Sequence, residues 1–467
     1  RGTGSETATS FNAEVTPQTG VSQSVHTTAL RATAEKGSKA VPYNLSNSTG
    51  AADVENTANC YVVNAPGTYS FPLVYGNAIN NGQVNYAAYT SKASIQGTLN
   101  PFINHLGNGI TDPYIAKNTD CVPVKAELVW QDAPSLVTDI KYNSGTNGGT
   151  ISFKVDKENI RQGNALIAIK DSQNTILWSW HIWITDENIY HTIKVTNHQN
   201  VSHDLMPIHL GWCEGEVINY AARSCQVQFI AHGQTRLITV NQMRSTTSTQ
   251  GNCTFYEWGR KDPLRPSSGY AYKNKTWYNA AGIASTANHA VESFPFGNEC
   301  IKNYIRKPDV MQKEIGGDNT YFNLWNADNN TNSNVYNDNP VTKTVYDPCP
   351  VGFAMPPSNT FTGFTTTGEN VTNTVAKYNG EWNSSLPGWN FYCRPNKTGG
   401  TIFFPMTGER ISSGGHLSAV GSLGHTWSAT STHSNYAHNL TLYTNYWVWP
   451  LDRFSKSAGH GVRPCLE

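Results

Sequence analysis

The densest set of side chains suited to binding lies near the end of the chain, at residues 434–457. This segment reads Ser-Asn-Tyr-Ala-His-Asn-Leu-Thr-Leu-Tyr-Thr-Asn-Tyr-Trp-Val-Trp-Pro-Leu-Asp-Arg-Phe-Ser-Lys-Ser. Tyrosine and tryptophan supply large contact areas with few rotatable bonds, and their rings can stack on the C–H face of a sugar while asparagine and arginine donate hydrogen bonds. The segment therefore predicts a surface that binds a saccharide or a protein epitope. The alternative is an aromatic-rich strand whose rings pack in the core, as we expect for Leu440 and Leu442.

Catalytic motifs are missing from the sequence. It contains no G-x-S-x-G elbow, no H-E-x-x-H and no glycine-rich phosphate loop between a strand and a helix. Glycoside hydrolysis by two facing carboxylates leaves no sequence signature, but acidic residues are scarce near the aromatic-rich segment. We therefore predict a binding protein and not an enzyme.

The cysteines and the acidic strings do not predict a metal site. The nine cysteines are scattered, with no C-x-x-C pair and no zinc-type spacing. The string Trp325-Asn326-Ala327-Asp328 departs by one inserted residue from the Trp-Asn-Asp string of calcium-dependent lectins. We expect no metal and no cofactor. Spacing favours only Cys213 with Cys225 as a disulfide, and buried reduced thiols are an equal alternative.

Charge and hydropathy limit the possible partners. Lysine plus arginine and aspartate plus glutamate number 33 each, so the net field does not attract a polyanion, and nucleic acid is not an expected partner. No apolar run approaches the roughly 20 residues that a membrane-spanning helix needs. We expect membrane attachment only through a lipid anchor outside this sequence.

The length of 467 residues predicts more than one domain. Residues 1–55 are rich in Thr, Ser, Ala and Gly, which predicts a flexible arm or linker. Residues 56–186 predict a β-sandwich because short alternating segments follow one another between turn signals. The expected strands lie at residues 60–63, 69–75, 124–130, 140–142, 150–155, 165–169 and 176–185.

The last of these strands has the strongest pattern. Alternation puts Trp178, Trp180 and Ile182 on one face and Leu177, Ser179, His181 and Trp183 on the other. Since both faces carry tryptophan, we expect both to be covered. His181 is then a packed core histidine and neither a metal ligand nor a base.

After residue 186 the composition changes, and glycine interrupts short apolar fragments. Four segments in this region resemble, in order, the major paralogous domain family first named from Fibrobacter succinogenes, whose members look like C-type-lectin folds. They are Leu205–Trp212, Phe255–Pro263, Tyr346–Phe353 and Gly459–Glu467, with Phe404–Arg410 and Trp427–Thr430 between the last two. Residues 187–467 are thus identified as a lectin-like α+β domain with long loops.

The resemblance also assigns roles to residues. Independently of it, the residue types of Phe255–Pro263, Asp347–Pro350 and Arg463 favour fold scaffolding, since their charges, prolines and large aromatics suit buried turns. A C-type-lectin fold usually presents its ligand-binding residues in its last portion, and the segment also resembles the hypervariable end of variable proteins of diversity-generating retroelements. The ligand-binding candidates implied are Tyr436, His438, Tyr443, Asn445, Tyr446, Trp447, Trp449, Arg453 and Ser455.

A shorter stretch, Asn59–Phe71, is similar to one that precedes such domains in Bacteroidales surface lipoproteins and fimbrillin-type, pilus-tip-like proteins. The resemblance implies an adhesin on the bacterial outer-membrane surface or fimbrium that binds a glycan or a protein on a host or neighbouring cell. One rival interpretation is a structural subunit that binds other pilus subunits through an open sheet edge. The enzymatic rival is the formylglycine-generating type, which shares the fold and requires two redox-active cysteines in one pocket.

Overall fold

The computed structural model describes residues 21–22, 24–215, 217–231, 233–248, 250–269, 272–313, 321–330, 335–432, 435–444 and 446–467. The chain divides into two compact units, of which unit 1 comprises Arg1–Val25 and Gly215–Thr249 and unit 2 comprises His26–Glu214 and Gln250–Glu467. The protein is β-rich, and the described residues contain two α-helices, α1 (Val25–Ala32) and α2 (Asn298–Arg306). No described helix is long and apolar enough to cross a membrane.

Unit 1 contains two small antiparallel sheets. Strand β14 (Val217–Tyr220) lies between β1 (Val21–Ser22) and β17 (Ser245–Ser248). The other sheet is a hairpin of β15 (Arg223–Ala231) and β16 (Gln234–Gln242), whose two strands pair along their full length. The pairing register puts Val227 opposite Ile238 and Cys225 opposite Val240 on one face of the hairpin, while Ile230 and Leu237 lie on the other face.

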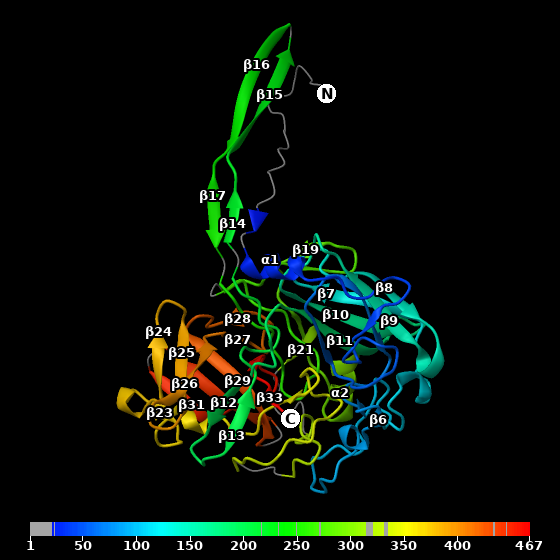
Figure 1. Ribbon diagram of the computed structural model, residues 1–467, viewed down its shortest axis with the longest axis vertical. Coiled ribbons are helices and arrows are strands. Elements are labelled where there is room, and N and C mark those ends of the chain that lie inside the picture. Colours follow the sequence, from blue (N-terminus) through cyan, green and yellow to red (C-terminus); the bar gives the residue numbers. More distant parts are fainter. Residues whose placement is uncertain are drawn as a thin grey trace. The chain divides into compact units, whose positions relative to one another are not determined.

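The first part of unit 2 is built on two sheets (Figure 1). The six-stranded sheet has the order β19 (Ala284–Ser285), β18 (Trp277–Tyr278), β7 (Lys125–Gln131), β10 (Gly163–Lys170), β11 (Ile176–Ile184) and β3 (Cys60–Val63). The four-stranded sheet has the order β2 (Tyr43–Asn44), β4 (Gly67–Pro72), β9 (Thr150–Val155) and β8 (Thr138–Asn143). The seven strands expected from the alternation are all confirmed.

Aromatic rings join these two sheets. The ring of Phe71 on β4 lies 5.1 Å from that of Tyr61 on β3 and 5.0 Å from that of Trp180 on β11, measured between centroids. Every residue of β11 is buried, as the two tryptophan-bearing faces predict. His181 is fully buried, and its Nε2 lies 2.9 Å from Asn164 Oδ1 while its Nδ1 lies 3.2 Å from Tyr256 Oη. The prediction of a packed core histidine is confirmed.

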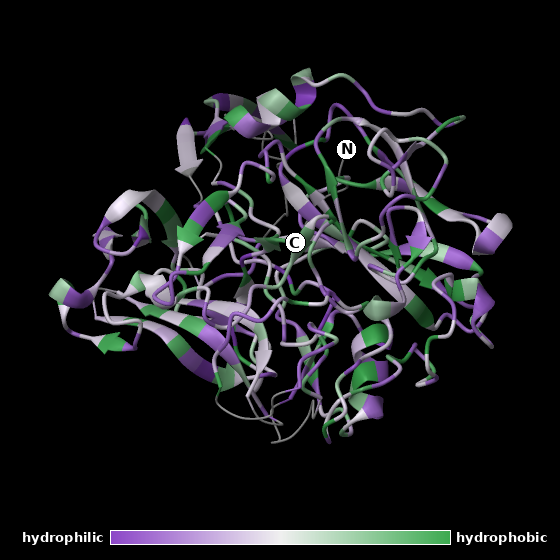
Figure 2. Ribbon diagram, turned by 60° about the horizontal axis from the view of Figure 1, so that its bottom comes forward, coloured by the Kyte–Doolittle hydropathy of each residue, from purple (hydrophilic) through white to green (hydrophobic). Residues whose placement is uncertain are grey.

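The second part of unit 2 contains several further sheets. A four-stranded sheet has the order β12 (Ile193–Thr196), β13 (Ser202–Leu205), β33 (Cys465–Leu466) and β22 (Phe353–Ala354). A five-stranded sheet has the order β23 (Val371–Thr372), β31 (Trp447–Ser455), β30 (Tyr436–Tyr443), β29 (Leu423–Ser431) and β32 (Gly461–Val462). Beside these are β24 (Gly380–Asn383), β25 (Gly388–Arg394) and β26 (Thr398–Pro405) in one sheet, and the pairs β27 (Glu409–Arg410) with β28 (Leu417–Ser418) and β20 (Ala290–Glu292) with β21 (Val310–Gln312). A further pair, β5 (Ile79–Asn80) with β6 (Gln83–Val84), belongs to the first part. Hydrophobic and hydrophilic residues alternate along many of these strands (Figure 2).

The predicted boundary near residue 187 falls inside unit 2. One hydrophobic core contains Trp178 and Trp183 from before this position together with Met206 and Trp427 from after it. Strand β18 also pairs with β7, so the six-stranded sheet takes strands from both sides of residue 187. The two predicted domains therefore share a core and a sheet, because pairing between distant segments leaves no trace in local composition.

The predicted arm at residues 1–55 also differs from the structure in its second part. Leu30 of α1 is fully buried in the main core, and β2 pairs with β4 through Tyr43 and Tyr69. Residues 1–20 lie outside the described residues. A few apolar side chains connect residues 26–55 to the core, because Tyr43, Leu45 and Val54 pack against it beside the buried Leu30.

The segments expected to be scaffolding are buried. Trp258, Arg260, Lys261 and Asp262 are each at most 3% exposed, and Gly259 has a φ of +86°, which favours glycine. Lys261 Nζ lies 2.7 Å from Asp262 Oδ2 and donates to the backbone oxygen of Ser179 on β11 at 2.9 Å. These contacts connect the segment to the six-stranded sheet, as a scaffolding role requires.

All nine cysteines are free thiols, and only Cys225 is exposed. The suggested disulfide between Cys213 and Cys225 is therefore wrong, and the alternative of buried reduced cysteines describes the other eight. Burial raises the pKa of the Cys465 thiol to about 12. The buried thiols thus behave as small apolar side chains.

Candidate functional site

The nominated C-terminal segment forms β30 and β31, two adjacent strands of the five-stranded sheet (Figure 1). Their register pairs Thr441 with Trp449 and, through the pairing of Leu442 with Val448, brings Tyr443 opposite Trp447. Leu440 and Leu442 point to the other face, where both are buried in a second hydrophobic core. The alternation of a strand thus separates a core face from a face that carries Tyr443, Trp447 and Trp449.

These three residues form a continuous row, which we call the aromatic row. The rings of Trp447 and Trp449 stack at 4.7 Å with an angle of 8° between their planes, and the ring of Tyr443 lies 4.9 Å from that of Trp447. All three side chains are half-buried, so part of each ring meets solvent. Trp449 Nε1 donates to Thr372 Oγ1 of β23 at 2.9 Å, and Trp389 Nε1 donates to the backbone oxygen of Tyr443. Stacking and hydrogen bonds therefore hold the row in place before any ligand arrives.

The other nominated residues lie in different environments. Tyr446 and Arg453 are exposed, and Tyr436 is exposed at the far end of β30. His438 is 1% exposed with its ring 3.9 Å from that of Tyr336, and Ser455 is 8% exposed. These two side chains are enclosed by protein, so they are not available at the surface. Asn445 lies outside the described residues.

A chain of polar side chains continues from the aromatic row into the protein. Thr441 pairs with Trp449 on one side and with His425 of β29 on the other, so the three side chains follow one another across the sheet on the same face. Thr441 Oγ1 donates to Asp452 Oδ2 at 2.6 Å and lies 2.9 Å from His425 Nδ1. Burial raises the pKa of Asp452, and its hydrogen bond with Thr441 opposes that rise.

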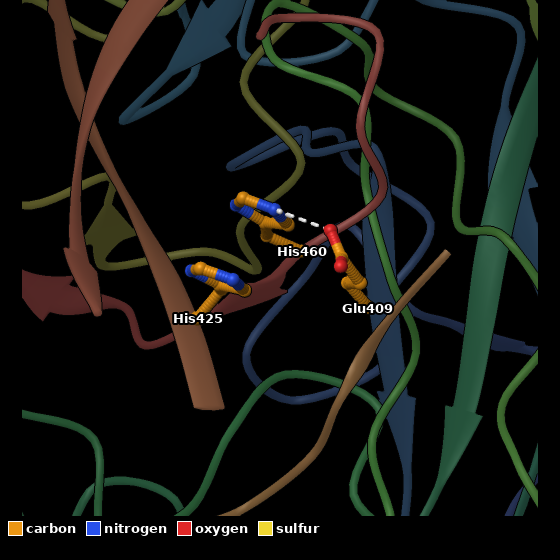
Figure 3. A group of neighbouring side chains, drawn as sticks. All are labelled: Glu409, His425 and His460. Atoms are coloured by element: carbon orange, nitrogen blue, oxygen red, sulfur yellow. Dashed lines mark ion pairs between the residues drawn. The ribbon is translucent and has the colours of Figure 1, made fainter. Parts of the chain in front are cut away.

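Behind this chain lies a group of three side chains that sequence inspection missed. His425 stacks on His460 with ring centroids 4.1 Å apart, and Glu409 lies beside His460 (Figure 3). The three residues are far apart in the sequence and share no motif. The sequence pattern that could have pointed to the group is the strand alternation, which puts His425 on the same face as Trp427. That alternation does not predict which residues from other segments lie beside His425.

Comparison with known proteins gives no family: no family model, no curated protein and no solved structure matches this chain. The fold and the site together define a β-rich protein that carries a half-exposed aromatic row on one face of a sheet. The lectin-like assignment, the adhesin role and the surface location stay predictions.

Proposed function

We propose that the protein is a cell-surface adhesin that binds a glycan or a protein ligand at the aromatic row and that it is not an enzyme. In this proposal the two sheets joined by Phe71 act as an N-terminal β-sandwich that presents a C-type-lectin-like region. The protein is exported and displayed on a bacterial outer membrane or fimbrium, and its partner lies on a host or neighbouring cell. The sequence resemblance supports the lectin-like organisation, and the aromatic row is the observation that carries the binding role.

The physical properties of the row support binding. Three half-exposed rings form a rigid apolar surface that loses little conformational entropy when a ligand covers it. The faces of Trp447 are turned toward its two neighbours, so a ligand contacts the exposed edges of the row. Arg453 and Tyr446, both exposed, are near in sequence and provide polar groups for hydrogen bonds. An exposed aromatic centre with a polar surround is typical of binding surfaces.

The test compares the full chain with two tryptophan variants on a glycan array and on arrayed host-surface proteins. We expect Trp447→Ala to lose binding, because the central ring supports both neighbours. Trp382→Ala is the matched control, since Trp382 is also half-buried but lies on β24, outside the row. Equal binding by both variants would contradict the assignment of the site, and no binding by the unchanged protein would contradict the adhesin role.

A second candidate function is a structural subunit that assembles with other subunits. The hairpin β15–β16 supports it, because Phe229, Ile238 and Val240 on one face are 36%, 53% and 36% exposed. A two-stranded hairpin with an uncovered apolar face is marginal by itself and gains stability when another surface covers it.

The molar mass of the full chain in solution, measured by light scattering over a range of concentrations, tests this candidate. We expect assembly that Ile238→Ser abolishes and that Gln226→Ser, which lies opposite Thr239 on the other face of the same hairpin, leaves intact. A monomer at every concentration would leave the hairpin without the role that this candidate assigns to it.

A further inference from the structure

Glu409, His425 and His460 bring two imidazoles and one carboxylate together from three segments of the chain. Their ligand atoms all lie within 4.8 Å of one another, and His460 Nε2 is 3.7 Å from Glu409 Oε2. The two histidines are 2% and 0% exposed, whereas the Glu409 side chain keeps some contact with solvent. Figure 3 shows the carboxylate of Glu409 turned toward one ring nitrogen of His460, which is Nε2.

Two side chains lie within hydrogen-bond distance of Nδ1 of His425, Thr441 Oγ1 at 2.9 Å and the amide nitrogen of Asn439 at 3.0 Å. Thr441 donates its single hydrogen to Asp452 at 2.6 Å, which leaves its oxygen as an acceptor toward His425, whereas the amide nitrogen of Asn439 can only donate. The two contacts favour opposite tautomers of His425. Metal binding at Nε2 requires the tautomer in which Nδ1 donates to Thr441 Oγ1, while the amide of Asn439 donates to the backbone oxygen of Leu440 and to Thr441 Oγ1.

Several nitrogens of this pair lack a hydrogen bond. Among the described residues, neither His425 Nε2 nor either ring nitrogen of His460 has a hydrogen-bond partner, although all three atoms are buried. Buried polar atoms in native proteins are nearly always paired, so unpaired ones that converge on a carboxylate point to a missing ligand. Burial also lowers the pKa of both histidines well below the ordinary value, which keeps them in the neutral form.

We propose that Glu409, His425 and His460 bind one divalent transition-metal ion of the zinc type. Two imidazoles and a carboxylate are a common ligand set for zinc, which leaves a fourth position for water or for a ligand oxygen. The chain His425–Thr441–Asp452 has the form of the outer hydrogen bonds that orient metal-bound histidines. The ion differs from the calcium of calcium-dependent lectins, which is bound by oxygen atoms.

Binding requires a local rearrangement. At zinc–ligand distances of about 2.0–2.1 Å, neighbouring donors in a tetrahedron are about 3.4 Å apart, so the three donors must move closer together. The two imidazole planes differ by only 7°, and lone pairs in parallel planes do not converge. One ring must tilt, and His460 is the ring that no hydrogen bond holds, although it also stacks on Trp427 at 4.2 Å.

The inference does not rest on the proposed adhesin role, because the ligand atoms come from the protein alone. His425 and the aromatic row do share one face of the sheet through Thr441. Glycan binding and zinc binding are therefore measured separately: a protein that binds zinc but no glycan contradicts only the adhesin role, and one that binds a glycan but no zinc contradicts only the metal site.

The test uses the full chain, stripped with a chelator and dialysed, with zinc chloride as the probe. We expect one equivalent of zinc by calorimetry and by elemental analysis, and a rise in the thermal midpoint on adding zinc. Cobalt(II) in place of zinc should give the visible absorption of a tetrahedral or five-coordinate site. Failure of the unchanged protein to bind zinc overturns the proposal.

Variants locate the site. Glu409→Gln and His460→Gln should each weaken zinc binding by more than about tenfold, and Thr441→Val should weaken it by about tenfold through loss of the hydrogen bond to His425. His416→Gln is the control for surface histidines, because His416 is exposed, and it should leave binding unchanged. If His416→Gln lowers the affinity for zinc and Glu409→Gln, although folded, binds zinc as tightly as the unchanged protein, the ion lies elsewhere and the assignment is wrong.

Discussion

The buried histidine of the central strand makes the stability of this protein depend on pH. Both faces of β11 are buried, so the His181 side chain is enclosed by protein, and this burial lowers its pKa from 6.5 to about 3. In the unfolded chain the same imidazole titrates at its ordinary value. Between these two values the unfolded state binds a proton that the folded state does not, so the free energy of unfolding falls as the pH is lowered through this window.

The size of the effect follows from this difference. One proton contributes about 1.4 kcal/mol per pH unit once the unfolded imidazole is fully protonated, so lowering the pH from 7.5 to 4.5 removes about 2.7 kcal/mol through His181 alone. Above about pH 7.5 its contribution is constant. Other buried histidines act in the same direction, as His105 does with a pKa lowered by burial to about 4. A variant that lacks His181 is therefore needed to measure the contribution of this one histidine to the pH dependence of stability.

His181→Gln is that variant, because an amide can still donate to Asn164 Oδ1 but does not titrate. At pH 7.5 we expect it to be less stable than the unchanged protein by about 1–3 kcal/mol, since Tyr256 loses its acceptor at Nδ1. At pH 4.5 the difference should shift by about 2.7 kcal/mol in favour of the variant, so that the deficit nearly vanishes or changes sign.

Urea denaturation at several pH values between 7.5 and 4.5, followed by circular dichroism, measures the difference. His416→Gln, which removes an exposed histidine, serves as the control for the general effect of losing an imidazole. A difference between the unchanged protein and His181→Gln that stays the same at every pH would refute the reasoning, because it would mean that folding does not change the proton affinity of His181.

Two further predictions concern thiols and a buried ion pair. In the folded protein a thiol reagent should rapidly modify only Cys225, because the other eight thiols are buried, and Cys225→Ser should abolish this rapid labelling. Mass spectrometry of the labelled chain counts the modified sites, and rapid labelling of two or more sites would contradict the prediction. Lys261→Met should lower the free energy of unfolding by about 3–5 kcal/mol, because it leaves the buried carboxylate of Asp262 without its cation. The double variant Lys261→Met with Asp262→Asn should recover part of this loss in the same urea measurement, and no recovery would show that the charge of Asp262 is not the cause.

The sequence alone determined the elements whose pattern is local. Strands β3, β4, β7, β8, β9, β10 and β11 were predicted from alternation and turn residues, since a strand shows its two faces within a few residues. The same reasoning placed His181 in the core and Leu440 and Leu442 on the core face of β30. The scaffolding role of Phe255–Pro263 followed from residue type, because large aromatics and paired charges near a glycine suit a buried turn.

Only the tertiary structure decided what depends on distant segments. Strand β18 joins the six-stranded sheet across the predicted boundary, and residues 26–55 pack on that part of the protein, because pairing partners and covering surfaces come from elsewhere in the chain. His438 is buried although its strand neighbour Tyr436 is exposed, since a separate loop brings Tyr336 over it. The group of Glu409, His425 and His460 exists only where three segments meet. The spacing of residues along the chain predicts which face of a strand each side chain lies on. It does not predict which side chains from distant segments meet, because that depends on how the strands and loops pack in the folded protein.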